Sequence, residues 1–389
     1  MSGYIFILLV ILSQFLIGND EIVRIIATSN VIGETDPCGW KKKPLGGLAR
    51  KATVLNQEAD RVSNFFVADA GNLFFSKNIL EPGISKETAI INADIILNSF
   101  NEMGCSVFSP GSKDFAAGSN FLLSLSQKAN FPFISSNIYD LNNNLLFDPY
   151  VILNNNNLKV AFIGLTSIFE NDNIIVKDPI ESLKYIVAEV SPISDIIILL
   201  FNSVDSDINK IQNEPLNITM IIRSNSTKGK QGSFDGGLGI PTYSLGEKGK
   251  VLYTFDLNIL NRNLELIDID WCERTIERNN VKLYKMKKGD MLIDLRQLFK
   301  DDSVTLSQIN RYENNIESAN QKLENAVNTI SLGKIELGKS VSGEVDILKV
   351  VDQGKLKIKQ ITSPQLDSQD NVQRHSHPHD HDGDGIPDH

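Results

Sequence analysis

Residues 23–55 constrain the fold of this chain most, because they combine the signals of a strand, a loop and a helix in one short stretch. An apolar run from Val23 to Ala27 ends abruptly in polar residues, and a loop rich in Gly, Pro and Lys follows. The run that begins at Leu48 is compatible with a helix. This order predicts a buried strand, a loop that builds a site, and then a helix.

The same alternation of short β-rich runs and helical stretches continues to about Arg274, which predicts a layered α/β architecture. In open α/β sheets, functional sites lie at the carboxyl ends of the strands, so the polar residues that close these runs are the candidate site. The expected strands are 23–28, 64–69, 105–108, 133–136, 159–165, 195–200, 218–222, 241–244 and 251–259, with helices over 88–102, 117–128 and 179–189.

The composition is that of an ordinary globular protein, with 389 residues, 41% apolar residues and a net charge of −10. This length predicts one large domain with a smaller appendage. The acidic balance argues against nucleic acid as a partner, because phosphate contacts need clustered Lys and Arg. The one dense basic run, Lys41–Lys43, is typical of a solvated loop, and the alternative is that it binds a small anion together with the N–H groups around Gly46.

The N-terminus is apolar from Tyr4 to Leu12 and again from Phe15 to Ile17. This run is too short for a stable membrane span, so we expect residues 1–18 to be a signal peptide and the mature chain to have no transmembrane helix. The alternative is a retained N-terminal anchor. Either reading predicts a periplasmic or extracellular protein.

All five histidines lie among the last 15 residues, so no imidazole is present from Met1 to Arg374. Three cysteines, Cys38, Cys105 and Cys272, allow at most one disulfide and show no CxxC spacing. Neither residue type therefore predicts a metal site in the α/β region.

After the α/β region, residues 275–333 have the pattern of a helical segment. Apolar residues from Ile309 to Ile330 recur at steps of three and four, which predicts a heptad seam. The seam of the 306–330 helix would pack on its own chain, for example on a helix at 290–300, and the alternative is self-association as a coiled coil. Residues 334–363 predict a small β-element, with a turn at Asp352–Gly354 and an alternation of period two from Lys355 to Ile361. Residues 364–389 predict a disordered His/Asp-rich tail.

Several of these segments resemble the calcineurin-like metallophosphoesterases, in particular the bacterial secreted 5′-nucleotidase-like (seleno)protein branch. The opening stretch resembles the family's Ser-Asp-x-His-Gly, Glu-Pro-Cys-Gly-(Cys or selenocysteine) and Pro-Leu-Gly-Gly-Leu-Ala-Arg motifs. The resemblance covers roughly residues 22–260. It implies a four-layer sandwich over residues 22–274, with two mixed sheets flanked by helices.

The family holds two divalent cations through Asp, His and Asn ligands, and one cation generates the attacking hydroxide. Residue by residue, the resemblance places this remnant phosphoesterase pocket on Asn30, Ile32, Asp69, Asn72, Ser109, Asn202 and Asn225. In this resemblance the family's first Asp falls on Asn30 and its His on Ile32. Among the positions that match family ligands, only Asp69 keeps its residue type. A dimetal centre is therefore not expected, and no catalytic residue is predicted. The alternative is a single hard cation held by Asp69, Asp36 and backbone oxygens.

The first-motif loop contains Asp36, Cys38 and Trp40, and Trp40 occupies the family's Cys or selenocysteine position. Trp40 would be a packing residue, and the alternative is a lost or misread redox residue beside Cys38.

The tail combines two metal-binding patterns. One is a histidine run, and the other is the first half of a calcium loop with oxygens at alternate positions. A solvated end with no ligand is the simplest alternative. The residues concerned are His375, His377, His379, His381, Asp380, Asp382, Asp384 and Asp388, which would suit Zn²⁺ or Ca²⁺.

Three functions follow from these patterns. The first is a secreted or periplasmic binding or structural envelope protein on a phosphoesterase scaffold, with an unidentified small anion or envelope component as its partner. The second is an active phosphoester or nucleotide hydrolase with unconventional ligands. The third is a metal-binding protein that acts through its tail.

Overall fold

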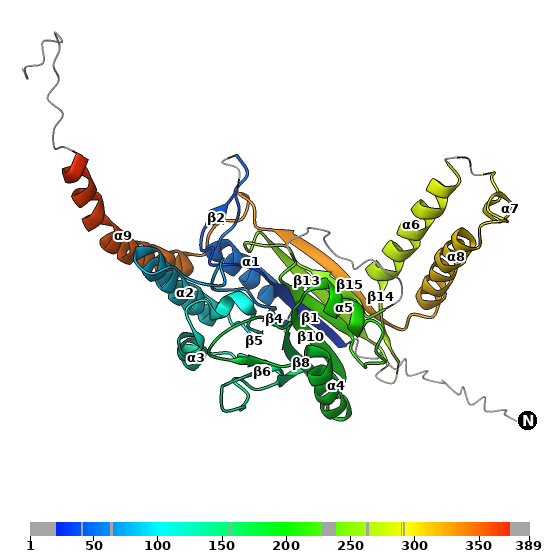
Figure 1. Ribbon diagram of the computed structural model, residues 1–389, viewed down its shortest axis with the longest axis horizontal. Coiled ribbons are helices and arrows are strands. Elements are labelled where there is room, and N and C mark those ends of the chain that lie inside the picture. The colour runs from blue at the N-terminus through cyan, green and yellow to red at the C-terminus, as the bar shows by residue number, and fades with distance from the viewer. Residues whose placement is uncertain are drawn as a thin grey trace, which may run out of the picture.

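The computed structural model describes residues 21–39, 42–62, 65–155, 158–226, 239–261, 264–288, 290 and 292–373, with side chains as far as Ser363. Two β-sheets form the centre of the molecule (Figure 1). The first sheet has the order β14 (Leu266–Asp268), β15 (Asn328–Glu336), β13 (Val251–Ile259), β1 (Glu21–Thr28), β4 (Phe65–Asp69), β5 (Val107–Phe108). The second has the order β12 (Thr242–Ser244), β11 (Met220–Ser224), β10 (Ile196–Asn202), β8 (Leu158–Thr166), β7 (Tyr150–Asn155).

Side-chain alternation along the strands brings the two sheets face to face. In β1, Ile25 and Ala27 point into the core between the sheets, whereas Ile26 packs under the helices on the outer face. In β8, Phe162 points into the same inter-sheet core and Ile163 points outward. Both faces of the central strands are therefore apolar, which explains their nearly continuous hydrophobic runs.

Helices cover the two outer faces. The outer face of the first sheet packs against α1 (Leu48–Arg61), and the outer face of the second packs against α4 (Pro179–Val190) and α5 (Asp205–Ile211). A further cluster joins α2 (Ile84–Glu102) and α3 (Ser119–Lys128) to the loops that follow the first-sheet strands. The predicted four-layer arrangement, with two mixed sheets flanked by helices, is confirmed.

Residues 275–333 differ in detail from the expected helical segment. The first helix, α6 (Ile269–Met286), begins earlier, and only the short α7 (Leu295–Leu298) forms within 290–300. The helix α8 (Ser303–Glu324) ends before the predicted seam does, and Ile330 is a buried residue of β15. Tertiary pairing with β13 overrides the helical spacing there, because the apolar face of β15 closes the inter-sheet core.

The seam of α8 is used within the chain. Its residues Ile309 and Ala319 are fully buried, and α8 packs against α6 rather than against a helix at 290–300. The three helices α6, α7 and α8 form an arm that projects from the body (Figure 1). The arm is inserted between β14 and β15, which are parallel neighbours in the first sheet.

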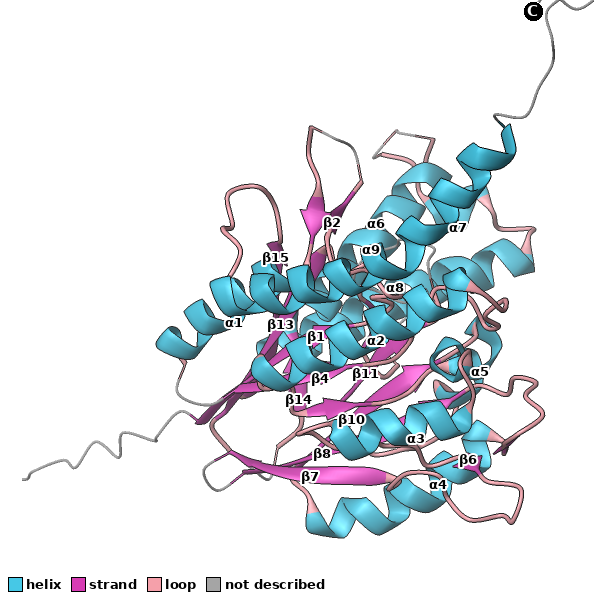
Figure 2. Cartoon of the chain, turned by 90° about the vertical axis from the view of Figure 1, so that its left-hand side faces the viewer, coloured by secondary structure: helices cyan, strands magenta, loops and turns pink. Residues whose placement is uncertain are grey.

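The predicted small β-element at 334–363 is wrong beyond the end of β15, because residues 345–373 form the long helix α9 (Val345–Gln373). Ile347 and Val351, four residues apart, are buried in the cluster with α2. Gly354 had indicated a turn, but it lies inside the helix, where a Cβ atom would come within 2.1 Å of Ile95 in α2. The glycine thus permits α9 to lie close across α2, as Figure 2 shows.

Within the described residues, no helix combines the length and apolar character needed to cross a bilayer. The apolar N-terminal run at residues 1–18 and the His/Asp-rich tail beyond residue 373 lie outside the described residues.

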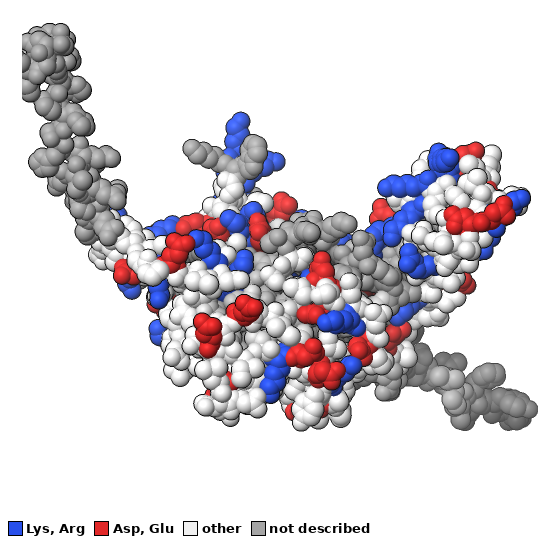
Figure 3. Space-filling view, in the orientation of Figure 1, with Lys and Arg blue, Asp and Glu red and all other residues white. Residues whose placement is uncertain are grey.

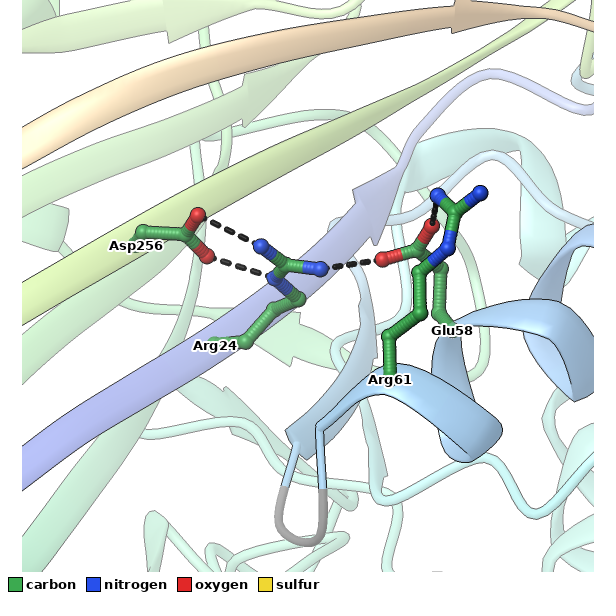
Figure 4. A network of polar contacts seen from close by, with 4 residues as sticks. All are labelled: Arg24, Glu58, Arg61 and Asp256. Carbon is green, nitrogen blue, oxygen red and sulfur yellow. Dashed lines mark hydrogen bonds and ion pairs between the residues drawn. The ribbon is translucent and has the colours of Figure 1, made fainter.

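A half-buried ion-pair network ties three elements together (Figure 4). Arg24 of β1 donates two hydrogen bonds of 2.6 Å to the carboxylate of Asp256 in β13, and a third to Glu58 of α1. Glu58 is nearly inaccessible, with 3% of its side chain exposed, and its other oxygen accepts a 3.0 Å bond from Arg61, which is 69% exposed. These carboxylates raise the pKa of Arg24 further above its ordinary value.

Arg24→Met should therefore lower the free energy of unfolding by about 3 kcal/mol, because it leaves Glu58 buried without its main counter-charge. The matched control is Arg61→Met, which removes an exposed partner of the same carboxylate and should cost less than about 1 kcal/mol. Urea denaturation of both variants measures the difference. Equal losses would show that the network does not depend on Arg24.

Candidate functional site

The candidate site lies where the central strands of both sheets end. Thr28 is paired with Asp69 and Asp69 with Phe108 in the first sheet, while Asn202 is paired with Ser224 in the second. These strands are parallel within each sheet, so their carboxyl ends gather at one edge. The residues predicted for the remnant phosphoesterase pocket all lie at or just after these strand ends.

Asn30 is hydrogen-bonded to two other predicted residues. Its Oδ1 accepts a 3.1 Å hydrogen bond from Nδ2 of Asn72 and a 2.9 Å bond from the backbone N–H of Asn225. Its Nδ2 donates to the carbonyl of Gly246 at 3.0 Å. The amide at the family Asp position therefore has partners for both its oxygen and its nitrogen within the protein.

Asn202 and Ser109 make a second set of contacts. Asn202 donates from Nδ2 to Oγ of Ser224 at 2.6 Å and accepts from the backbone N–H of Ser112 at 3.1 Å. Ser224 in turn donates to the carbonyl of Ala70, and Ser109 donates to the carbonyl of Leu200 at 3.3 Å. Ser224 was not predicted from the sequence. Its place as the last residue of a buried strand is the signal that could have identified it.

Asp69 is the one carboxylate among the matched ligand positions, and it is completely buried. It accepts 2.9 Å and 2.7 Å hydrogen bonds from Gly71 N–H and from the hydroxyl of Thr28. That hydroxyl accepts a 3.0 Å bond from Nζ of Lys51, a buried residue of α1 whose ammonium group also lies 3.9 Å from the centre of the Phe100 ring. Burial raises the pKa of Asp69 to about 7, partly offset by Lys51, and burial lowers the pKa of Lys51.

Lys51 was missed by sequence reasoning. It follows Arg50 on a helix, where a lysine is usually solvated. Only the tertiary structure shows that its side chain runs inward beneath the strand ends and supplies a positive charge near Asp69.

Asp114 fixes the loops of the site. It is fully buried and accepts hydrogen bonds of 2.8–2.9 Å from the backbone N–H groups of Asn72, Phe74 and Gly111. Burial raises its pKa to about 6 despite these donors. The side chain of Asn72, held in this way, accepts a 3.2 Å bond from Lys113 N–H.

The loop backbone has an unusual conformation at four predicted site positions. The φ angles are 52° at Asn30, 52° at Ile32, 56° at Asn72 and 64° at Asn225. Asparagine tolerates this left-handed region, but a β-branched isoleucine is strained there. Ile32 is held by a 2.9 Å hydrogen bond from its N–H to the carbonyl of Asn72.

The first-motif loop points elsewhere. Asp36 forms a 2.5 Å ion pair with Lys355 of α9, and Cys38 belongs to a two-residue pairing of β2 (Pro37–Cys38) with β3 (Leu45–Gly46). Burial raises the pKa of the Cys38 thiol, which disfavours the reactive thiolate. Trp40 and all the predicted tail ligands lie outside the described residues, so the redox and tail-metal hypotheses stay predictions.

The donor set does not fit a dimetal centre. The matched positions offer one carboxylate, neutral amides, a hydroxyl and the apolar Ile32, whereas two dications need several anionic or imidazole ligands. Each oxygen of Asp69, the one carboxylate, already accepts a hydrogen bond from the protein. Across the part of the chain that the structure describes, no group of three His, Cys, Asp or Glu side chains is placed to hold a metal ion.

Comparison with known proteins agrees with the fold. No protein-family model matches the chain. A 5′-nucleotidase of Vibrio parahaemolyticus is 28% identical over 123 residues, which are 31% of this chain and 21% of that protein. A 5′-nucleotidase of Vibrio cholerae is 28% identical over 154 residues, 37% of this chain and 27% of the relative. The chain thus spans only about a quarter of the length of these curated relatives.

Solved structures extend the likeness to most of the chain. The 5′-nucleotidase precursor of Thermus thermophilus has a TM-score of 0.59 at 13% identity and covers 89% of this chain and 60% of its own. The NAD nucleotidase of Haemophilus influenzae has a TM-score of 0.52 at 16% identity, covering 61% and 47%. The fold is therefore shared with these nucleotidase structures. In sequence, the chain resembles 5′-nucleotidases over about a third of its length.

The buried charges of the site should be energetically coupled. Lys51→Met and Asp69→Asn should each lower the free energy of unfolding by about 3 kcal/mol, because each leaves a buried charge uncompensated. The double variant should lose less than the sum of the two by roughly 1–3 kcal/mol. Chemical denaturation of the three variants closes the cycle, and strictly additive losses would argue against the pairing.

The strain at Ile32 should reverse the usual order of stability of alanine and glycine variants. At a positive φ, Ile32→Gly should be more stable than Ile32→Ala by about 1 kcal/mol, because glycine has no Cβ to strain. The control is Ile168, which is 62% exposed and absent from the residues with positive φ. There the alanine variant should be at least as stable as the glycine variant, and thermal unfolding compares the two pairs.

Proposed function

We propose that this protein is a secreted or periplasmic binding or structural protein that keeps a 5′-nucleotidase-like fold and has lost the dimetal chemistry of that fold. The observation that carries the proposal is the hydrogen bonding of Asn30, Asn202 and Asp69. The side chains at these metal-ligand positions instead form hydrogen bonds within the protein.

The positive charge near Asp69 comes from the protein itself. Burial raises the pKa of Asp69 to about 7, and Lys51 partly offsets this rise. The nearest compensating charge is the ammonium group of Lys51, reached through the hydroxyl of Thr28. A single amine beneath the strand ends replaces neither the Lewis acid nor the hydroxide source that phosphoester hydrolysis by this mechanism requires.

The location rests on two features. The apolar run at the N-terminus has the length of a signal-peptide core, and one protein with this fold is described as a precursor.

A small anion as the bound partner is supported by the exposed Lys42 and Lys43 in the first-motif loop.

The retained Asp69 and the left-handed loop backbone favour a second candidate, a hydrolase with an unconventional ligand set. The histidine-rich composition of the tail favours a third, metal capture by residues 375–389. The three candidates predict different metal contents for the same chain.

The full chain should bind Mn²⁺ or Zn²⁺ only through its tail, so replacement of all five histidines by alanine should abolish Zn²⁺ binding in calorimetry. Neither protein should hydrolyse AMP or nitrophenyl phosphate above the rate in buffer. Two equivalents of metal retained by the His-free protein, with turnover abolished by Asp69→Asn, would establish the second candidate and overturn the proposal. Zn²⁺ bound by the full chain and lost from the His-free protein would support the third candidate alongside the first.

A matched gain-of-ligand variant sharpens the test. Asn30→Asp with Ile32→His restores two family ligand types at the strand ends. In the His-free background, this variant should bind Mn²⁺ more tightly than its parent if the scaffold is inherited and only the donors are missing. Unchanged Mn²⁺ affinity would show that the loop geometry has also been lost.

A further inference from the structure

The arm formed by α6, α7 and α8 has an apolar groove near its tip. The groove has a volume of about 740 Å³ and lies between the C-terminal half of α6 and residues 292–296. Its apolar lining comes from Val281, Leu283, Tyr284, Leu292, Ile293 and Leu295. It lies far along the chain from the remnant pocket and shares no residue with it.

The side chains around this groove are unusually exposed for their type. Leu292 is 95% exposed, Tyr284 is 48% exposed and Val281 is 45% exposed. Leu298 and Val304, on the adjoining helices, are also exposed. Large apolar side chains gathered in this way on one projecting element mark an interaction surface.

This surface is distinct from the heptad seam of α8. The seam residues Ile309 and Ala319 are completely buried by packing within the chain. An association through the arm would therefore use the tip groove and not a coiled coil of α8.

The two sides of the arm that flank the groove differ in charge. Of the charged residues that line the groove itself, Lys287 lies on the α6 side, and Asp294, Arg296 and Glu313 lie on the other side, where Arg296 pairs with Glu313. Residues 278–288, at the end of α6, contain five basic and no acidic residues. Residues 290–317, on the α7–α8 side, contain six acidic and three basic residues. Figure 3 shows Lys and Arg along the α6 side of the arm and Asp and Glu across its other side.

We propose that the groove docks the same groove of a second copy of this chain about a twofold axis. A twofold axis that runs parallel to the groove brings each basic wall opposite the partner's acidic wall, so one surface is its own complement. The exposed apolar side chains would then meet at the centre of the interface and the charges would form its rim. Because the arm projects from the body, two arms can meet without contact between the sheets (Figure 1).

Analytical ultracentrifugation of the full chain tests the proposal. The weight-average mass should rise with concentration from that of one chain, 43.2 kDa before any cleavage, towards that of two. Leu292→Asp should weaken self-association about tenfold or more, because it places a charge at the centre of the interface. Leu356→Asp, at a 61% exposed leucine of α9 outside the arm, is the matched control and should leave the association unchanged.

Charge reversal tests the twofold arrangement separately from folding. Lys285→Glu with Lys288→Glu lowers the net charge of residues 278–288 from +5 to +1, and Asp290→Lys with Asp301→Lys changes that of residues 290–317 from −3 to +1. Each variant alone should associate more weakly than the native chain, and an equimolar mixture of the two should associate again. Unchanged thermal unfolding of each variant shows that the fold is intact.

A native chain that stays monomeric at all concentrations would overturn the proposal, as would self-association that Leu292→Asp leaves intact. A mixture of charge-reversed variants that does not associate would overturn the twofold pairing of the walls. None of these results depends on whether the remnant pocket binds metal.

Discussion

The site depends on hydrogen bonds between uncharged groups that connect the two sheets. Ser109 bonds to the second sheet at Leu200, Ser224 bonds back to Ala70 after the first, and Asn225 donates to Asn30. In a dimetal enzyme, cations would join ligands from both sheets at this edge. Here side-chain amides and hydroxyls make the connection, and each net contribution of about 1 kcal/mol is small but requires no ion. These hydrogen bonds therefore hold the strand ends of the two sheets in place.

Much of the fold could be predicted from the sequence, because the central strands bury both faces and leave long apolar runs. The polar residue that closes each run then marks the edge where the strands end, and this is why Asn30, Asp69 and Asn202 could be expected to lie close together. The hydrogen-bond partners of their side chains could not be predicted. The partners of Asn30 come from residues 72, 225 and 246, and no local pattern connects positions so far apart.

The misread segments share a physical cause. Ile330 fits a helical repeat and also fits a strand, and the choice depends on β13, which lies some 75 residues earlier in the chain. Gly354 indicates a turn in isolation, but its missing side chain is needed where α9 crosses Ile95. The burial of the charged Lys51 could not be predicted for the same reason. It depends on the space beneath two strands and not on the neighbours of Lys51 in the sequence. In each case a distant contact decided between two locally acceptable states.

The parallel pairing of β14 and β15 has an evolutionary consequence. The whole arm leaves the sheet at Asp268 and returns at Asn328, on adjacent strands of one edge. Helical turns can be gained or lost between these two points without changing the register of any strand. Only the distance between the two ends of the arm at Asp268 and Asn328 must be kept. Descendants of this chain could thus lengthen, shorten or recode the arm while the sandwich stays the same. Any partner recognised there would be free to diversify separately from the pocket.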